Sequence, residues 1–149
     1  MKVKEIMEVS VISVSPSTTY EEVAKILYKN NISGVPVLDE MNKIVGFVSE
    51  KDIFRILYPH YKSYYEHPES YSDSDARESK AVEIKNHPAE MFMVKNPVLC
   101  GAEDSVMKVG ALMLARNVSR IPVIEAGQVV GMVSRKMIYR AVLKENFGL

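Results

Sequence analysis

The sequence has a single cysteine, no long apolar run and no excess of charge of either sign. Cys100 has no second cysteine with which to form an intrachain disulfide, and a free thiol is typical of a reducing compartment. No apolar run is long enough to form the core of a signal peptide or to span a membrane. These absences predict a soluble, cytoplasmic protein that does not associate with membranes.

The charge balance and the polar residues also argue against several functions. Nineteen basic and nineteen acidic side chains cancel, so no long-range field attracts nucleic acid or anionic lipid. No histidine or carboxylate constellation accompanies Cys100, as nucleophilic catalysis would require. The three histidines, at positions 60, 67 and 87, lack the spacing of metal ligands. The sequence therefore predicts no enzyme, no metal site and no nucleic-acid partner.

The chain contains a tandem repeat. Residues 32–38, ISGVPVL, return as residues 118–124, VSRIPVI, an offset of 86 from residue 32 to residue 118. Residues 44–49, IVGFVS, return as residues 129–134, VVGMVS, at an offset of 85, so the turn between them has lost one residue. A unit of about 50 residues buries too little apolar surface to be stable alone. The two copies are therefore expected to pack on each other about a pseudo-twofold axis, with a cleft lined by equivalent residues.

Each copy has the same predicted order of elements. In the first copy, residues 11–14 predict a short strand, and apolar residues at three-and-four spacing predict an amphipathic helix from residue 20. Two β-branched runs, residues 35–38 and 44–48, predict a hairpin, and a second helix is expected after Ser49. The corresponding segments of the second copy are residues 97–100, 106–113, 121–124 and 129–133, with a helix after Ser134.

Residues 58–88 have no counterpart in the repeat and are predicted to form an insertion. Its centre, residues 69–75, is acidic and serine-rich and is expected to be mobile until a ligand or partner orders it. Residues 76–86 predict a helix. The predicted organisation is therefore a first repeat at residues 1–57, a partly helical insertion, and a second repeat at residues 89–149.

Each copy resembles the CBS domain, and the pair resembles the Bateman module formed by two such domains. The motifs that carry the resemblance are ISGVPV at residues 32–37, GFVSEKD at 46–52, VSRIPV at 118–123 and GMVS at 131–134. The resemblance covers roughly residues 3–57 and 89–143. It implies an α+β fold in which two βαββα repeats pack through their sheets about a pseudo-twofold axis. It also implies a regulatory module that senses a ligand.

In the family, the cleft between the repeats binds AMP, ADP, ATP or S-adenosylmethionine-like molecules as regulatory ligands, and no catalytic cofactor is implied. The family's Ser/Thr-x-x-Asp element for ribose and phosphate matches Ser49 and Asp52. The apolar adenine pocket is lined from the first strand and from the segment before the proline. The matching positions are Met7, Ile12, Ile32, Ser33 and Val35 in the first copy, and Met93, Val98, Val118, Ser119 and Ile121 in the second.

The residue types suit this chemistry. The carboxylate of Asp52 can accept hydrogen bonds from both ribose hydroxyls, and a helix start with the Ser49 hydroxyl favours a phosphate. The same pair also reads as an ordinary helix N-cap, and the two roles are compatible. In the second copy Ser134 keeps the cap, but Met137 replaces the aspartate, which predicts a single working site.

Two arginines are candidate phosphate ligands. Arg120 precedes the second proline motif and Arg135 lies beside the second helix start, so both can reach the cleft from the opposite half. Arg120 can equally be solvated or lie at a dimer interface, because exposed arginines are common in both places.

Two functions therefore remain open. The first is a nucleotide sensor whose occupancy changes its binding to an effector protein. The alternative is a structural dimerisation module with an empty cleft. Apolar residues on the predicted helix faces indicate a homodimer in either case, because contiguous exposed apolar patches usually mark an interface. These residues are Phe54, Leu57, Tyr139 and Val142.

Overall fold

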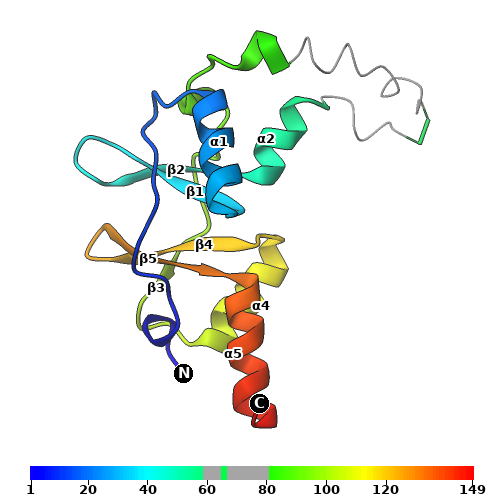
Figure 1. Cartoon of the computed structure of the whole chain (residues 1–149). Coiled ribbons are helices and arrows are strands. Elements are labelled where there is room, and N and C mark those ends of the chain that lie inside the picture. The colour runs from blue at the N-terminus through cyan, green and yellow to red at the C-terminus, as the bar shows by residue number, and fades with distance from the viewer. Residues whose placement is uncertain (59–64, 67–80) are drawn as a thin grey trace.

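The computed structural model describes residues 1–58, 65–66 and 81–149. Two halves follow the same order, and their sheets lie next to each other in the middle of the molecule (Figure 1). The first half contains α1 (Tyr20–Asn30), β1 (Gly34–Leu38), β2 (Ile44–Ser49) and α2 (Glu50–Ile56). The second contains β3 (Cys100–Gly101), α4 (Val106–Arg116), β4 (Arg120–Glu125), β5 (Gln128–Ser134) and α5 (Arg135–Phe147). Short 3-10 turns, η1 (Val3–Glu5) and η4 (Ala89–Met91), precede them. The predicted α+β fold is confirmed.

The two hairpins are equivalent residue by residue. Val35 pairs with Val48 in the first hairpin, and Ile121 pairs with Val133 at the matching place in the second. Each ladder has a register shift in its second half, after Val37 and after Val123. The predicted hairpins are therefore confirmed, including the shorter turn of the second copy.

The predicted first strands are wrong in extent. Within residues 11–14 only Val14 forms a bridge, to Val37, and β3 is limited to Cys100–Gly101. The reason is that the chain is crossing between the halves at both places. Residues 9–13 and 95–99 run from a pairing in one half to a pairing in the other, so they have no neighbouring strand along most of their length.

The segment at the start of each repeat packs on the other half. Glu8 exchanges two backbone hydrogen bonds of 2.9 Å with Met132 of the second half. Val94 makes the equivalent pair with Phe47 of the first half, at 2.9 and 3.0 Å. In Figure 1 the blue N-terminal segment accordingly starts beside the second half and then passes to α1. Each half is thus completed by the segment that begins the other copy.

Helix periodicity places equivalent residues in the two cores. Helix α1 of the first half buries Tyr20, Val23 and Leu27, and helix α4 of the second half buries the residues 86 positions later, Val106, Val109 and Met113. Both helices end at an asparagine in the left-handed conformation, Asn31 with φ 50° and Asn117 with φ 51°. Asparagine tolerates this conformation better than most residues, so it stops both helices at the same point.

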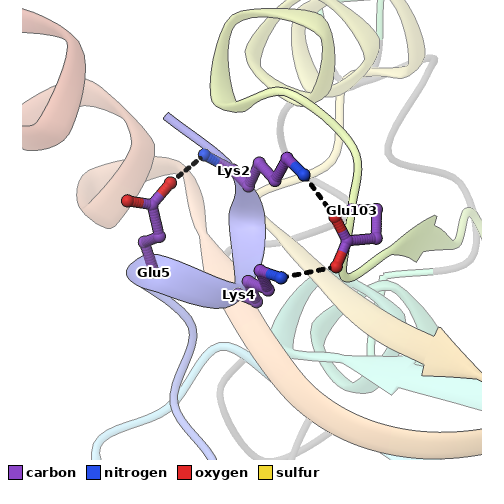
Figure 2. Close-up of polar contacts among 4 residues, drawn as sticks. All are labelled: Lys2, Lys4, Glu5 and Glu103. Atoms are coloured by element: carbon purple, nitrogen blue, oxygen red, sulfur yellow. Dashed lines mark hydrogen bonds and ion pairs between the residues drawn. The ribbon is translucent and has the colours of Figure 1, made fainter.

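The N-terminal turn is attached to the second half by an exposed ion-pair cluster, shown in Figure 2. The Lys2 and Lys4 ammonium nitrogens each lie 2.6 Å from a different carboxylate oxygen of Glu103. These hydrogen bonds lower the pKa of Glu103 to about 2. Because all three side chains are at least half exposed, solvent screening limits their contribution to stability.

The end of the insertion packs against α1. Residues 81–84 are helical, inside the predicted helix, and Ile84 is buried with 2% exposure. The amide of Tyr20 donates to the carbonyl of His87 at 2.8 Å. The rest of the predicted helix and residues 69–75 lie outside the described residues. Across the described ranges, no helix combines the length and the apolar character needed to cross a bilayer.

Candidate functional site

A cavity of about 650 Å³ opens between the two halves, a size typical of small-molecule sites. It corresponds to the cleft in which the sequence predicts a ligand site. The first half contributes Ser33, Phe47, Ser49, Glu50, Lys51, Asp52 and Arg55. The crossing segment contributes Val94, Asn96, Pro97 and Val98, and the second half contributes Arg116, Asn117, Val118, Ser119, Arg120 and Arg135.

The cavity lies beside the pseudo-twofold axis. The hydroxyl oxygens of Ser33 and Ser119, which are equivalent in the repeat, lie 3.3 Å apart. Near this contact the first half presents the start of α2, and the second half presents the loop between α4 and β4. A ligand in the cavity would therefore touch both halves at once.

Ser49 and Asp52 form a reciprocal cap at the start of α2. The Ser49 hydroxyl oxygen accepts from the Asp52 amide at 3.2 Å, and Asp52 Oδ2 accepts from both the amide and the hydroxyl of Ser49 at 2.9 Å. The predicted cap is present. Within the described part of the chain, Oδ1 of Asp52 accepts no hydrogen bond. One carboxylate oxygen thus fixes the side chain, and the other remains available in the cavity wall.

Basic side chains outnumber acidic ones along the cavity. Lys51, Arg55, Arg116 and Arg135 are exposed and line it, against Glu50 and Asp52. Arg135 Nη2 donates to the carbonyl of Val118 at 3.0 Å, which places that guanidinium at the cavity edge. Cations from both halves therefore face one space, an arrangement that suits an anionic ligand.

Arg120 differs from these four residues. Its side chain is only 8% exposed, Nε donates to the carbonyl of Gly34 at 3.1 Å, and Nη2 donates to Glu8 Oε2 at 3.1 Å. The guanidinium is engaged inside the chain, between the halves. The alternative of a solvated Arg120 is therefore wrong. The hydrogen bonds of Arg120 to Gly34 and Glu8 hold its guanidinium between the halves.

The structure divides the residues predicted for the site into two groups. Eight line the cavity: Ser33, Ser49, Asp52, Val98, Val118, Ser119, Arg120 and Arg135. Seven lie outside its lining: Met7, Ile12, Ile32, Val35, Met93, Ile121 and Ser134. Val35 and Ile121 are wholly buried between sheet and helices, because the strand face on which they lie points into the core.

The two methionines lie in the halves opposite to their copies. Met7 packs against Gly131, where an added Cβ would come within 2.6 Å of its sulfur. Met93 packs against Gly46 in the same way. The prediction that Met7 lines the pocket of the first copy and Met93 that of the second is therefore wrong. The chain crosses between the halves after each methionine, so each one packs in the half opposite to its own copy.

Several lining residues were absent from the sequence-based prediction: Phe47, Glu50, Lys51, Arg55, Val94, Asn96, Pro97, Arg116 and Asn117. Helical spacing could have found Arg55, because residues three apart on a helix are neighbours and Asp52 was already a candidate. Nothing in the linear pattern places Arg116 beside α2. That proximity depends on how the halves pack.

Cys100 and the possible metal ligands were predicted to have no functional role. Burial and the nearby Asp104 raise the pKa of the Cys100 thiol to about 11, so it stays protonated near neutral pH. In residues 1–58, 65–66 and 81–149, no group of three or more histidine, cysteine, aspartate or glutamate side chains is arranged to hold a metal ion. His60 and His67 lie outside these ranges.

Comparison with known proteins agrees with this architecture. The CBS domain family model matches residues 3–59 and 89–144. The chain is 25% identical over 143 residues to a CBS domain-containing protein of Dictyostelium discoideum, covering 95% of this chain and 91% of that one. It spans 58% of a chloroplastic CBS domain-containing protein of Arabidopsis thaliana, and 24% of a homoserine O-acetyltransferase of Methanohalobium evestigatum.

Solved structures show the same fold. The CBS domain pair of protein MJ0100, in complex with 5'-methylthioadenosine and S-adenosyl-L-methionine, superimposes with a TM-score of 0.73 at 26% identity, covering 97% of this chain and 98% of that one. CBSX2 in complex with AMP has a TM-score of 0.73 at 21% identity, covering 97% and 98%.

Proposed function

Because this chain belongs to the CBS domain family, with two copies in tandem, we propose that it is a regulatory module that binds an adenine nucleotide between its halves. The observation that carries the proposal is the cavity itself. It brings an unengaged carboxylate oxygen of Asp52 together with four cationic side chains drawn from both halves. No bond needs to be made or broken at such a site, so the proposed role is regulatory rather than catalytic.

Asp52 is the proposed ribose ligand. Its Oδ2 is held by Ser49, which orients the carboxylate, and Oδ1 can accept from the ribose hydroxyls. Hydrogen bonds to a charged acceptor are stronger than neutral ones, and a carboxylate can accept from two adjacent hydroxyls. The apolar lining of Phe47, Val94 and Val118 provides a surface for the adenine ring.

The cationic lining favours a ligand that carries phosphate. AMP, ADP and ATP are anionic, whereas S-adenosylmethionine carries a sulfonium cation and 5'-methylthioadenosine carries no phosphate. Arg55 and Arg116 are exposed on the cavity from opposite halves, so a phosphate between them can receive donors from both. The MJ0100 domain pair holds 5'-methylthioadenosine and S-adenosyl-L-methionine. The basic lining of this chain supports the phosphorylated members of the same adenosine class.

A homodimer and an effector protein complete the proposal. Exposed apolar residues occur at equivalent places on the helices, Tyr28 with Leu114 and Phe54 with Tyr139, each between 61 and 88% exposed. Phe54 also stacks on Tyr58, with ring centroids 5.0 Å apart, while Leu57 and Val142 are half-buried. A repeated apolar face on the helices supports self-association. A monomeric mass by light scattering at micromolar concentration would contradict it.

A cytoplasmic location stays a prediction, supported by the buried free thiol.

Calorimetry with AMP, ADP, ATP, S-adenosylmethionine and 5'-methylthioadenosine tests the proposal. We expect the phosphorylated compounds to bind at one site per chain. Asp52→Ala should weaken AMP binding about tenfold or more, since a hydrogen bond to a charged group contributes about 1.5–3 kcal/mol. Glu40→Gln removes an exposed carboxylate from the hairpin turn outside the cavity lining and serves as the control. Binding of none of the five compounds would leave the alternative, a dimerisation module with an empty cleft.

A further inference from the structure

The repeat defines a second position equivalent to the cavity. The cavity is walled by the paired residues Phe47 and Val94, and by Arg120 from the other half. Their equivalents are Met132, Glu8 and Gly34, and the Glu8–Met132 backbone pair has the same geometry as the Val94–Phe47 pair. By the pseudo-twofold axis these three residues should wall a second cavity of the same kind.

The side chain of Arg120 extends into this second position. Its Nε donates to the carbonyl of Gly34, and its Nη2 donates to the carboxylate of Glu8, both at 3.1 Å. Both acceptors belong to the wall of the second position, although Arg120 itself begins β4. With 8% exposure, the Arg120 side chain is closed off from solvent there.

Among the described residues, the first cavity has no comparable pair of side chains. Gly34, the counterpart of Arg120, has no side chain, and Val94, the counterpart of Glu8, is apolar and lines the open space. The second position therefore differs from the first at two places, Glu8 and Arg120. The two differences go together, because the Glu8 carboxylate pairs with the Arg120 guanidinium. An unpaired buried guanidinium would be costly, so the pair is expected to stay together.

We propose that the Arg120–Glu8 ion pair fills the second ligand position from within, so that each chain keeps one open site. This inference rests on the proposed nucleotide binding in the first cavity. The counterpart of Asp52 in the second position is Met137, which cannot bind a ribose. This difference alone would still leave an open space. The Arg120 side chain, which is 8% exposed, occupies the space itself, and the half-exposed Glu8 holds it there.

Replacing Glu8 and Met137 by their first-site counterparts, and Arg120 by alanine, tests the proposal. We expect calorimetry with AMP to give one site per chain for the parent and for Met137→Asp, because the ion pair still fills the second position. The triple variant Glu8→Val, Arg120→Ala, Met137→Asp should give two sites. Adding Asp52→Ala to the triple variant should weaken one of its two sites, the first, about tenfold or more and leave the second unchanged. Circular dichroism and thermal unfolding establish that each variant folds.

Several outcomes would overturn the proposal. Two sites in the parent, or in Met137→Asp, would show that the ion pair does not close the second position. One site in a folded triple variant would show that something else closes it. Absence of binding of all five adenosine compounds by the parent would instead refute the proposed function on which the inference rests.

A measurement on the parent covers the case in which the triple variant does not fold. The Arg120 Nε–H is buried and hydrogen-bonded, so its nuclear magnetic resonance signal should exchange slowly with solvent. Saturation with AMP should leave this exchange slow, because the nucleotide enters only the first cavity. Fast exchange on saturation would show that the nucleotide displaces the ion pair, and would overturn the proposal.

Discussion

The hydroxyl oxygens of Ser33 and Ser119 lie 3.3 Å apart, although 86 residues separate them along the chain. The two serines are the same position in the two copies, so their contact marks the pseudo-twofold axis. Residues near this axis contact both halves. Gly34 and Arg120, which directly follow these serines, are therefore a difference between the two halves that lies next to this axis.

The cavity arginines should control affinity for phosphate rather than for adenosine. We expect Arg55→Ala and Arg116→Ala to weaken ATP binding more than adenosine binding, because only ATP presents phosphates to them. The loss should shrink as salt is raised, since ionic screening weakens exposed charge interactions. Calorimetry at low and high salt measures both effects. Arg140→Ala, an exposed arginine of α5 outside the cavity lining, is the matched control. Equal losses for ATP and adenosine would contradict the phosphate role.

The close packing of the N-terminal segment predicts that Gly131→Ala is destabilising. An added Cβ would lie 2.6 Å from the Met7 sulfur and 2.9 Å from the backbone oxygen of Glu8, and the backbone contact cannot be relieved by a rotamer change. Overpacking of this kind costs about 1–3 kcal/mol in the free energy of unfolding. Gly101→Ala is the control, because its added Cβ would come no closer than 3.6 Å to any neighbour. Equal denaturant midpoints for the two variants would show that the segment is not packed as described.

Cys100 should be unreactive in the folded protein. Its thiol is buried and has a pKa of about 11, so at pH 8 only about one thiol in a thousand is ionised. Reaction with Ellman's reagent is expected to be slow at pH 8 and fast in denaturant. The ratio of the two rates measures the protection. Rapid labelling without denaturant would contradict the burial of this strand.

The ion pairs of Glu103 predict a pH-dependent contribution to stability. Its folded pKa of about 2 is below the usual value of about 4.3, so the stabilisation is present above the usual value and is lost as pH falls toward 2. We expect Glu103→Gln to lower the denaturant midpoint slightly at pH 6, and the difference from the parent to disappear below pH 2. High salt should also reduce the difference, since all three side chains are exposed. A difference that persists in acid would assign the effect to another contact.

The sequence by itself determined the local structure and its duplication. Hairpins, helices and the caps at Ser49 and Ser134 depend on residues close together in the chain, so their spacing and types were enough to predict them. The repeat also predicted the axis and the cleft, because two similar units that each lack a sufficient core must pack together. Asp52 was found for the same reason, since it lies three residues from its capping serine.

Only the tertiary structure decided in which half the segments around Met7 and Met93 pack. Met7 lies against Gly131 and Met93 against Gly46, and no local pattern distinguishes this exchange from packing within one copy. Arg120 likewise looked available for a ligand until its partners were known. Glu8 is 112 residues away from it in the chain, and such a pair forms only because the packing of both halves brings the two charges within 3.1 Å. The Arg120–Glu8 ion pair is therefore a property of the assembled halves, set by contacts that neither copy contains alone.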